Sequence, residues 1–160
     1  PDNAVSEARE RVHSAIKNSG YTFPTGKVIV NLAPADIRKE GTNYDLPIAV
    51  GILKEQGIDI PDDNNTAFLG ELSLDGNLRK VNGILPLVSG LKENGITTVF
   101  VPEENAREAA LVKDMVILGV KHLADIAGHY TENPLKPTVI DINEYQQEMQ
   151  IQIFHMILKM

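Results

Sequence analysis

Short apolar runs alternate with amphipathic segments between residues 97 and 128, and this alternation restricts the fold more than any other feature. Residues 97–102 (TTVFVP) and 115–120 (MVILGV) have the β-branched composition of buried strands. Residues 103–112 and 122–128, which follow them, have the spacing of helices. Strands separated by a helix pair in parallel through a right-handed crossover. The chain is therefore predicted to belong to the α/β class.

The amino-terminal part predicts a helix, a strand and a second helix. The first helix is indicated by apolar residues at spacings of three and four, namely Val5, Ala8, Val12, Ala15 and Ile16. The strand is the run at residues 27–33. The second helix is apolar nearly all round, as central helices are, and continues to about Leu53. Asn43 or Asp45 can cap its amino end.

Asp75 and Gly76 mark the clearest turn in the sequence. They lie between two strand-like stretches within residues 66–81. An Asp-Gly pair supplies the positive φ angles of a type I′ turn, so a β-hairpin is predicted here. A helix that ends at Gly95 follows it. The fold expected is a mixed sheet with a β-hairpin and packed helices.

The composition excludes several classes of protein. The formal net charge of -7 disfavours attraction to nucleic acid over the whole surface, so any DNA contact must be local. The absence of cysteine removes disulfides and thiol catalysis, and it fits a reducing cytosol. No apolar run reaches the roughly 18 residues of a membrane span, and no signal peptide opens the sequence. We expect a cytoplasmic protein without a membrane partner.

The composition and periodicity of the sequence change after the predicted helix at residues 122–128. Residues 1–128 form the predicted domain, and residues 129–140, with two prolines and no periodicity, are interpreted as a linker. Residues 141–160 predict a final helix that needs a partner, with apolar positions Ile151, Phe154, Ile157 and Leu158. Because the sequence opens directly on a helix without a Met, we interpret it as starting inside a longer protein.

The segment before the central helix carries most of the candidate chemistry. Its ionisable residues are Asp36, Arg38, Lys39, Glu40 and Asp45. Acid–base catalysis by two carboxyl groups requires environments that separate their pKa values. Acidic and basic side chains are interspersed here, so a network of ion pairs is the preferred interpretation. The helix amino terminus that follows could bind an anion, although Asp45 as a cap would compete for its N–H groups.

Nucleotide and metal motifs are not evident. Five residues separate Gly20 from Gly26, and Val28 follows the lysine, so the Walker A spacing fails. His122, Asp125 and His129 could share one helix face, but a third strong ligand is lacking. No metal site is predicted, and a solvated surface is the preferred interpretation.

Two long stretches resemble a known family. Residues 30–53 (VNLAPADIRKEGTNYDLPIAVGIL) and 68–111 (FLGELSLDG through AREAAL) closely resemble the amino-terminal domain of magnesium-chelatase-related, competence-type AAA+ proteins, often labelled ATP-dependent proteases. The resemblance covers residues 1 to about 125. It implies a fold like the Lon protease domain, preceded in family members by further strands.

The resemblance to Lon also implies a test for catalysis. Lon proteases use a serine in this loop and a lysine in the helix after the hairpin, because a serine hydroxyl is a weak nucleophile without a base. Alignment places Asn43 at the serine position and Leu85 at the lysine position. An amide cannot attack and leucine cannot accept a proton. We therefore expect no catalytic residue and no cofactor in this part of the protein.

The function implied is that of a noncatalytic accessory and oligomerisation domain of an AAA+ ATPase. The family resemblance implies a hexameric ring that acts on DNA, as in branch migration during natural transformation, with ATP and magnesium bound by a separate motor module. The candidate nucleic-acid contacts are Arg38, Lys39, Arg79 and Lys80. The alternatives are a Lon-type protease, magnesium insertion into porphyrin, and self-association through an unpaired sheet edge.

Overall fold

A small parallel sheet lies at the centre of the fold. The computed structural model describes residues 3–24 and 44–159. Strand β4 (Thr98–Pro102) lies between β1 (Thr66–Phe68) and β5 (Val116–Val120), and it pairs in parallel with both. The predicted parallel pairing of the two late strands is therefore confirmed. The strand predicted at residues 27–33 lies outside the described residues.

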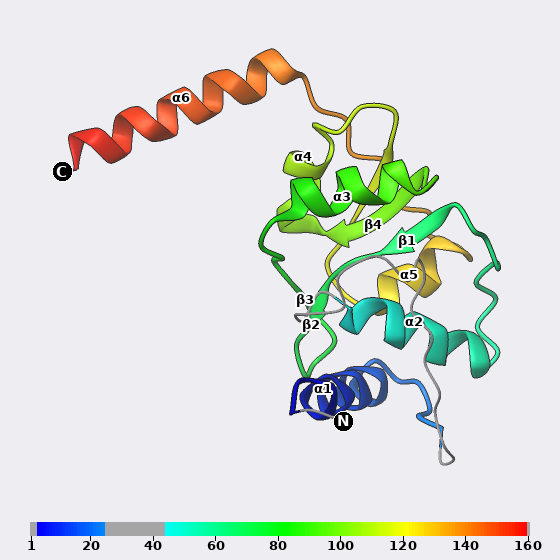
Figure 1. Ribbon diagram of the computed structural model, residues 1–160. Helices are drawn as coiled ribbons and strands as arrows, with labels where there is room; N and C mark the ends of the chain where they lie inside the picture. The colour runs from blue at the N-terminus through cyan, green and yellow to red at the C-terminus, as the bar shows by residue number, and fades with distance from the viewer. Residues whose placement is uncertain (1–2, 25–43, 160) are drawn as a thin grey trace.

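Helices cover both faces of this sheet, as Figure 1 shows. On one face lie α3 (Ile84–Glu93) and α4 (Glu103–Ala109). On the other lie α2 (Asp45–Glu55) and α5 (Ala124–His129), and α1 (Asn3–Asn18) packs on α2. The helices predicted in these regions are confirmed.

Two apolar cores follow from the alternation of side chains along β4. Phe100 belongs to the core shared with α1, α2 and α5, and its ring stacks on Phe68 with centroids 4.7 Å apart. Val99 and Val101 belong to the core shared with α3 and α4. All three β4 side chains are fully buried. Burial on both faces is what a parallel sheet requires.

The hairpin forms a separate two-stranded sheet of β2 (Glu71–Leu72) and β3 (Leu78–Arg79). The predicted mixed α/β fold with a hairpin is thus confirmed. The stretch before the turn divides into two strands, because the chain bends between β1 and β2. At this bend the carbonyl of Gly70 accepts a hydrogen bond from the N–H of Leu46, at 3.0 Å.

The turn of the hairpin differs from the predicted type. The N–H of Ser73 donates to the Asn77 carbonyl at 2.9 Å, which leaves a three-residue loop. Gly76 has a φ of 96°, whereas Asp75 is not among the described residues with positive φ. The predicted type I′ turn is therefore wrong. The physical reason is that the Asp75 carboxylate accepts the backbone N–H of Asn77 at 3.3 Å, as in an Asx turn, and also accepts bonds from Ser73 Oγ and Asn77 Nδ2.

The chain continues past α5 along the edge of the sheet. The N–H of Thr138 donates to the Ile117 carbonyl of β5 at 2.8 Å, and Leu135 packs against the core. Helix α6 (Ile142–Leu158) follows, capped by the Asp141 carboxylate. Figure 1 shows α6 extending away from the sheet and its helices. Among the described residues, no helix is long and apolar enough to cross a membrane.

Candidate functional site

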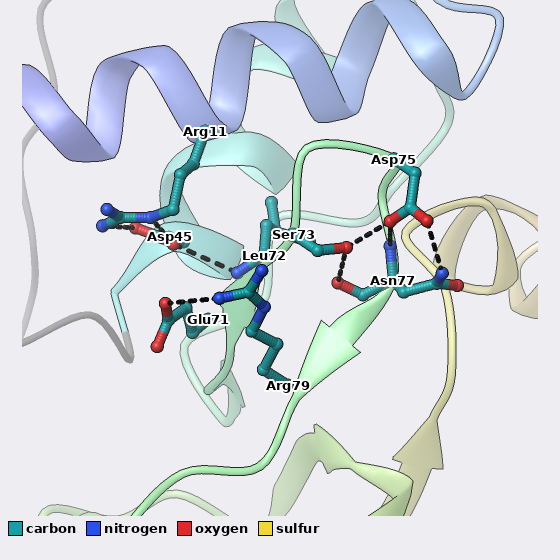
Figure 2. A network of polar contacts seen from close by, with 8 residues as sticks. All are labelled: Arg11, Asp45, Glu71, Leu72, Ser73, Asp75, Asn77 and Arg79. Carbon is teal, nitrogen blue, oxygen red and sulfur yellow. Dashed lines mark hydrogen bonds and ion pairs between the residues drawn. The ribbon is translucent and has the colours of Figure 1, made fainter.

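A buried ion pair fixes the amino end of α2. The Asp45 carboxylate is 1% exposed, and it accepts two bonds from the Arg11 guanidinium, from Nε at 2.7 Å and from Nη2 at 3.0 Å. It also accepts the N–H of Leu72 at 3.0 Å. Figure 2 shows these side chains converging from α1, α2 and the hairpin. One carboxylate therefore joins three elements at the start of the central helix.

Burial outweighs hydrogen bonding at this carboxylate, so the pKa of Asp45 lies above its usual value. Burial raises the pKa of Asp45, and the bonds from Arg11 and Leu72 act in the opposite direction. The hydrogen bond to Asp45 raises the pKa of Arg11. A bidentate guanidinium is among the strongest partners that a buried carboxylate can have. The charged form of Asp45 in the fold therefore depends on Arg11.

The expectation that Asp45 caps α2 and competes for its free N–H groups is wrong. The cap residue is Tyr44, which makes no capping bond with its side chain, and Asp45 is the first helical residue. The charge-assisted bonds to Arg11 and the Leu72 N–H turn the carboxylate away from the helix end. The alternative cap, Asn43, lies outside the described residues, as do the other members of the charged segment: Asp36, Arg38, Lys39 and Glu40.

Arg79 and Lys80 are exposed at the end of the hairpin. Arg79 is 61% exposed, and its Nη1 lies 3.8 Å from Oε1 of Glu71, its cross-strand neighbour (Figure 2). An exposed ion pair of this length contributes little stability. The structure thus describes two of the four candidate nucleic-acid contacts, since Arg38 and Lys39 fall in the undescribed segment.

Leu85, at the position aligned with the Lon lysine, lies in the first turn of α3 and is half-buried. Its neighbour Ile84 is fully buried in the core shared with β4. An aliphatic side chain there supplies packing and no proton acceptor. Asn43, at the position aligned with the Lon serine, is not described.

His122 and His129 hold backbone groups in place. The ring of His122 accepts the N–H of Ala124 at Nδ1, at 3.0 Å, so its proton resides on Nε2, which lies 3.0 Å from the Asp75 carbonyl. His129 accepts the N–H of Leu135 at Nδ1, and burial lowers the pKa of its imidazole. In the part of the chain that the structure describes, no cluster of metal-ligating side chains is present.

Sequence reasoning missed two buried polar contacts, those of Arg11 and Asn105. Asn105, 1% exposed, accepts the Val81 N–H at 2.8 Å and donates to the Val81 carbonyl at 2.9 Å, which clamps the segment between β3 and α3. A local signal exists for Arg11. It lies three residues after Ala8 and four before Ala15, so it interrupts the apolar stripe of α1.

A parallel sheet covered by helices, with a hairpin hydrogen-bonded to the buried carboxylate of the central helix, defines a mixed α/β domain. The sequence profile of the family described as subunit ChlI of Mg-chelatase matches residues 1–105. The chain belongs to this ChlI family.

Individual relatives agree with this assignment. The chain is 42% identical over 144 residues to the uncharacterized protein YifB of Salmonella typhimurium and 38% identical over 127 residues to the competence protein ComM of Haemophilus influenzae. It is 28% identical over 141 residues to Lon protease 2 of Bacillus subtilis. These alignments cover 84%, 79% and 84% of the chain, and 28%, 25% and 25% of the relatives.

The chain therefore spans about a quarter of the length of the curated relatives it matches. The predicted resemblance to magnesium-chelatase-related, competence-type proteins is confirmed, and the more distant similarity to a Lon protease was also anticipated. The family match supports the expected AAA+ assignment.

Proposed function

We propose that residues 1–128 form a noncatalytic accessory domain of an AAA+ ATPase that acts on DNA. The observation that supports the noncatalytic role is that the buried polar side chains bind other parts of the fold. In the described part of the chain the buried polar residues are Asp45 and Asn105, and both are hydrogen-bonded to other elements of the fold, whereas the buried Tyr44 Oη makes no hydrogen bond. Neither Asp45 nor Asn105 is free to act as an acid or a base.

A Lon-type protease is the second candidate, and it is favoured only by the similarity to Lon protease 2. Its mechanism requires a hydroxyl and a desolvated amine in contact. The aligned positions hold Asn43 and Leu85, whose side chains supply neither group. The sequence difference therefore supports an architectural role for the domain.

The proposed action on DNA draws on two observations. One relative is named a competence protein, and the exposed Arg79 and Lys80 place two adjacent cations at the end of the hairpin. In the full-length protein this domain would contribute to self-association in a hexameric ring, with ATP and magnesium bound by the motor module. The cytoplasmic location and the competence role are parts of the same proposal.

Fluorescence anisotropy with labelled single-stranded and duplex oligonucleotides tests the DNA contact. We expect binding that weakens as salt rises, with a logarithmic slope of about -2 to -4 if two to four phosphates are contacted. Reversal of both hairpin cations, Arg79→Glu with Lys80→Glu, should lower the affinity at least about tenfold and reduce the slope by about 2.

The matched control reverses two exposed lysines elsewhere, Lys113→Glu with Lys136→Glu, and changes the net charge by the same amount. It should leave most of the affinity intact. Extending the reversal to Arg38 and Lys39 tests the remaining candidates. No binding at low salt, or an equal loss in the control, would show that these residues are ordinary surface charges.

A further inference from the structure

The chain between α5 and α6 is bound to the domain. Residues 130–139, called the strap below, contain no helix and no named strand. The N–H of Thr138 donates to the Ile117 carbonyl of β5 at 2.8 Å, and the half-buried side chain of Leu135 packs against the core. The strap therefore fixes the place at which the chain leaves the domain toward α6.

His129, the last residue of α5, holds the middle of the strap. Its Nδ1 accepts the backbone N–H of Leu135 at 2.9 Å. Residues 134–138 include two prolines, which have no N–H to donate. The N–H groups of this stretch that bind the domain are those of Leu135 and Thr138. Loss of the bond to His129 would leave the stretch with half of these bonds.

The atom that holds Leu135 is also the atom that takes up a proton. A neutral imidazole has one N–H and one acceptor nitrogen. Because Nδ1 of His129 accepts the Leu135 N–H, the proton of the neutral ring resides on Nε2, and a second proton must bind at Nδ1. Both nitrogens of an imidazolium are donors. Binding of a proton and binding of the strap therefore exclude each other.

The surroundings of the ring disfavour the imidazolium. The ring centroid of His129 lies 5.2 Å from that of Phe100 and 4.8 Å from that of Tyr130, with interplanar angles of 87° and 85°. Burial among these side chains lowers the pKa of His129. The neutral ring, which can accept the Leu135 N–H, is thus the form that the closed strap favours.

No bonded counter-ion offsets this burial. The titratable side chains on α5, on the strap and on the loop before β1 are those of Tyr130, Asp63, Asp125, Glu132 and Lys136. Asp63 helps to raise the pKa of Tyr130, Asp125 accepts the N–H of His122, and Glu132 and Lys136 are exposed. Among the described residues, no carboxylate forms an ion pair with His129.

We propose that His129 and the strap form a proton-sensitive latch, in which the neutral imidazole holds the strap on the domain and protonation at Nδ1 releases it. The released histidine has the ordinary pKa of about 6.5, whereas the pKa in the closed latch is lower. The closed latch is therefore fully stable above about pH 6.5, and it opens as the pH falls toward the lowered pKa. This proposal does not depend on the proposed contact with DNA.

Amide hydrogen exchange of the 160-residue chain, followed by NMR near pH 8 and near pH 5, tests the latch. After correction for the intrinsic pH dependence of exchange, the protection factor of the Leu135 amide should be at least about fivefold lower near pH 5. The amides of Val99 and Val101 in β4 report unfolding of the whole domain. Their protection factors should change by less than about twofold, so the loss at Leu135 is local.

Replacement of the histidine separates protonation from other effects of acid. His129→Asn keeps a side-chain acceptor but cannot titrate in this range, so its Leu135 protection should be the same at both pH values. His155→Asn is the matched control, because His155 is exposed on α6, and it should behave as the wild type does.

The titration of the His129 ring in the wild type decides the proposal even if His129→Asn does not fold. Its midpoint, measured by NMR, should lie below about pH 6.5 and coincide with the loss of Leu135 protection. Leu135 protection that is unchanged when His129 becomes protonated would overturn the proposal. The same pH-dependent loss of protection in a folded His129→Asn variant would also overturn it.

Discussion

Replacement of Arg11 by Met lowers the free energy of unfolding by about 3–5 kcal/mol near pH 8. The substitution keeps an aliphatic side chain of similar length in α1 but removes both guanidinium donors from the Asp45 carboxylate. That carboxylate is 1% exposed and keeps the N–H of Leu72. A buried charge that loses its partner is among the most destabilising of single changes.

The loss of stability caused by Arg11→Met should become smaller as the pH falls, and the direction of this change follows from the pKa of Asp45. Burial raises this pKa and Arg11 opposes the rise, so the folded-state pKa in the variant lies further above that of the unfolded chain. A group with a raised folded-state pKa contributes stability that is present at low pH and is lost as pH rises through that pKa. As the pH falls through this raised pKa, Asp45 of the variant therefore gains a proton and part of the loss is recovered.

Urea unfolding followed by far-ultraviolet circular dichroism, at pH 5 and pH 8, measures both effects. Arg9→Met is the control, because Arg9 is exposed on the same helix, and it should change stability by less than about 0.5 kcal/mol. The double variant Arg11→Met with Asp45→Asn should be more stable at pH 8 than Arg11→Met alone. An Arg11→Met deficit that is the same at both pH values would contradict the role assigned to the carboxylate.

Replacement of Asn105 by Leu lowers the free energy of unfolding by about 2–4 kcal/mol. Leucine fills a similar volume but leaves the N–H and the carbonyl of Val81 without the amide that binds both, at 2.8 and 2.9 Å. Both residues are buried, so water does not replace these bonds. Each unsatisfied buried group costs about 1–3 kcal/mol.

Hydrogen exchange distinguishes this effect from a general loss of packing. The Val81 amide should lose protection by a larger factor than the amides of β4 do. Asn64→Leu, a change of the same chemistry at an exposed loop position, should be nearly neutral. If Asn105→Leu left the stability and the Val81 exchange rate unchanged, the clamp would have no energetic role.

Local patterns predicted the helices and strands because those patterns repeat within a few residues. The β-branched apolar run around Phe100 and the periodicity of α1 are examples, and both correspond to buried residues in the structure. The hairpin was located for the same reason. Its turn type was not, because side-chain bonds within the loop, centred on Asp75, decide the backbone conformation there.

The contacts that organise the candidate site could not be predicted in the same way. Arg11 and Asp45 are 34 residues apart, and Val81 and Asn105 are 24 apart, so no local pattern pairs them. The apolar stripe of α1 shows that Arg11 lies at the edge of a buried face. It does not show which carboxylate meets it, and that pairing depends on how α1, α2 and the hairpin pack together.

A peptidase assay tests the central claim most directly, namely that this domain lacks the reacting groups of a Lon-type protease. The purified chain is incubated with fluorescently labelled, unfolded casein beside a Lon protease as the positive control. We predict release of fluorescence no faster than in buffer, for both the wild type and Asn43→Ala. Hydrolysis by the wild type that Asn43→Ala abolishes would contradict the claim.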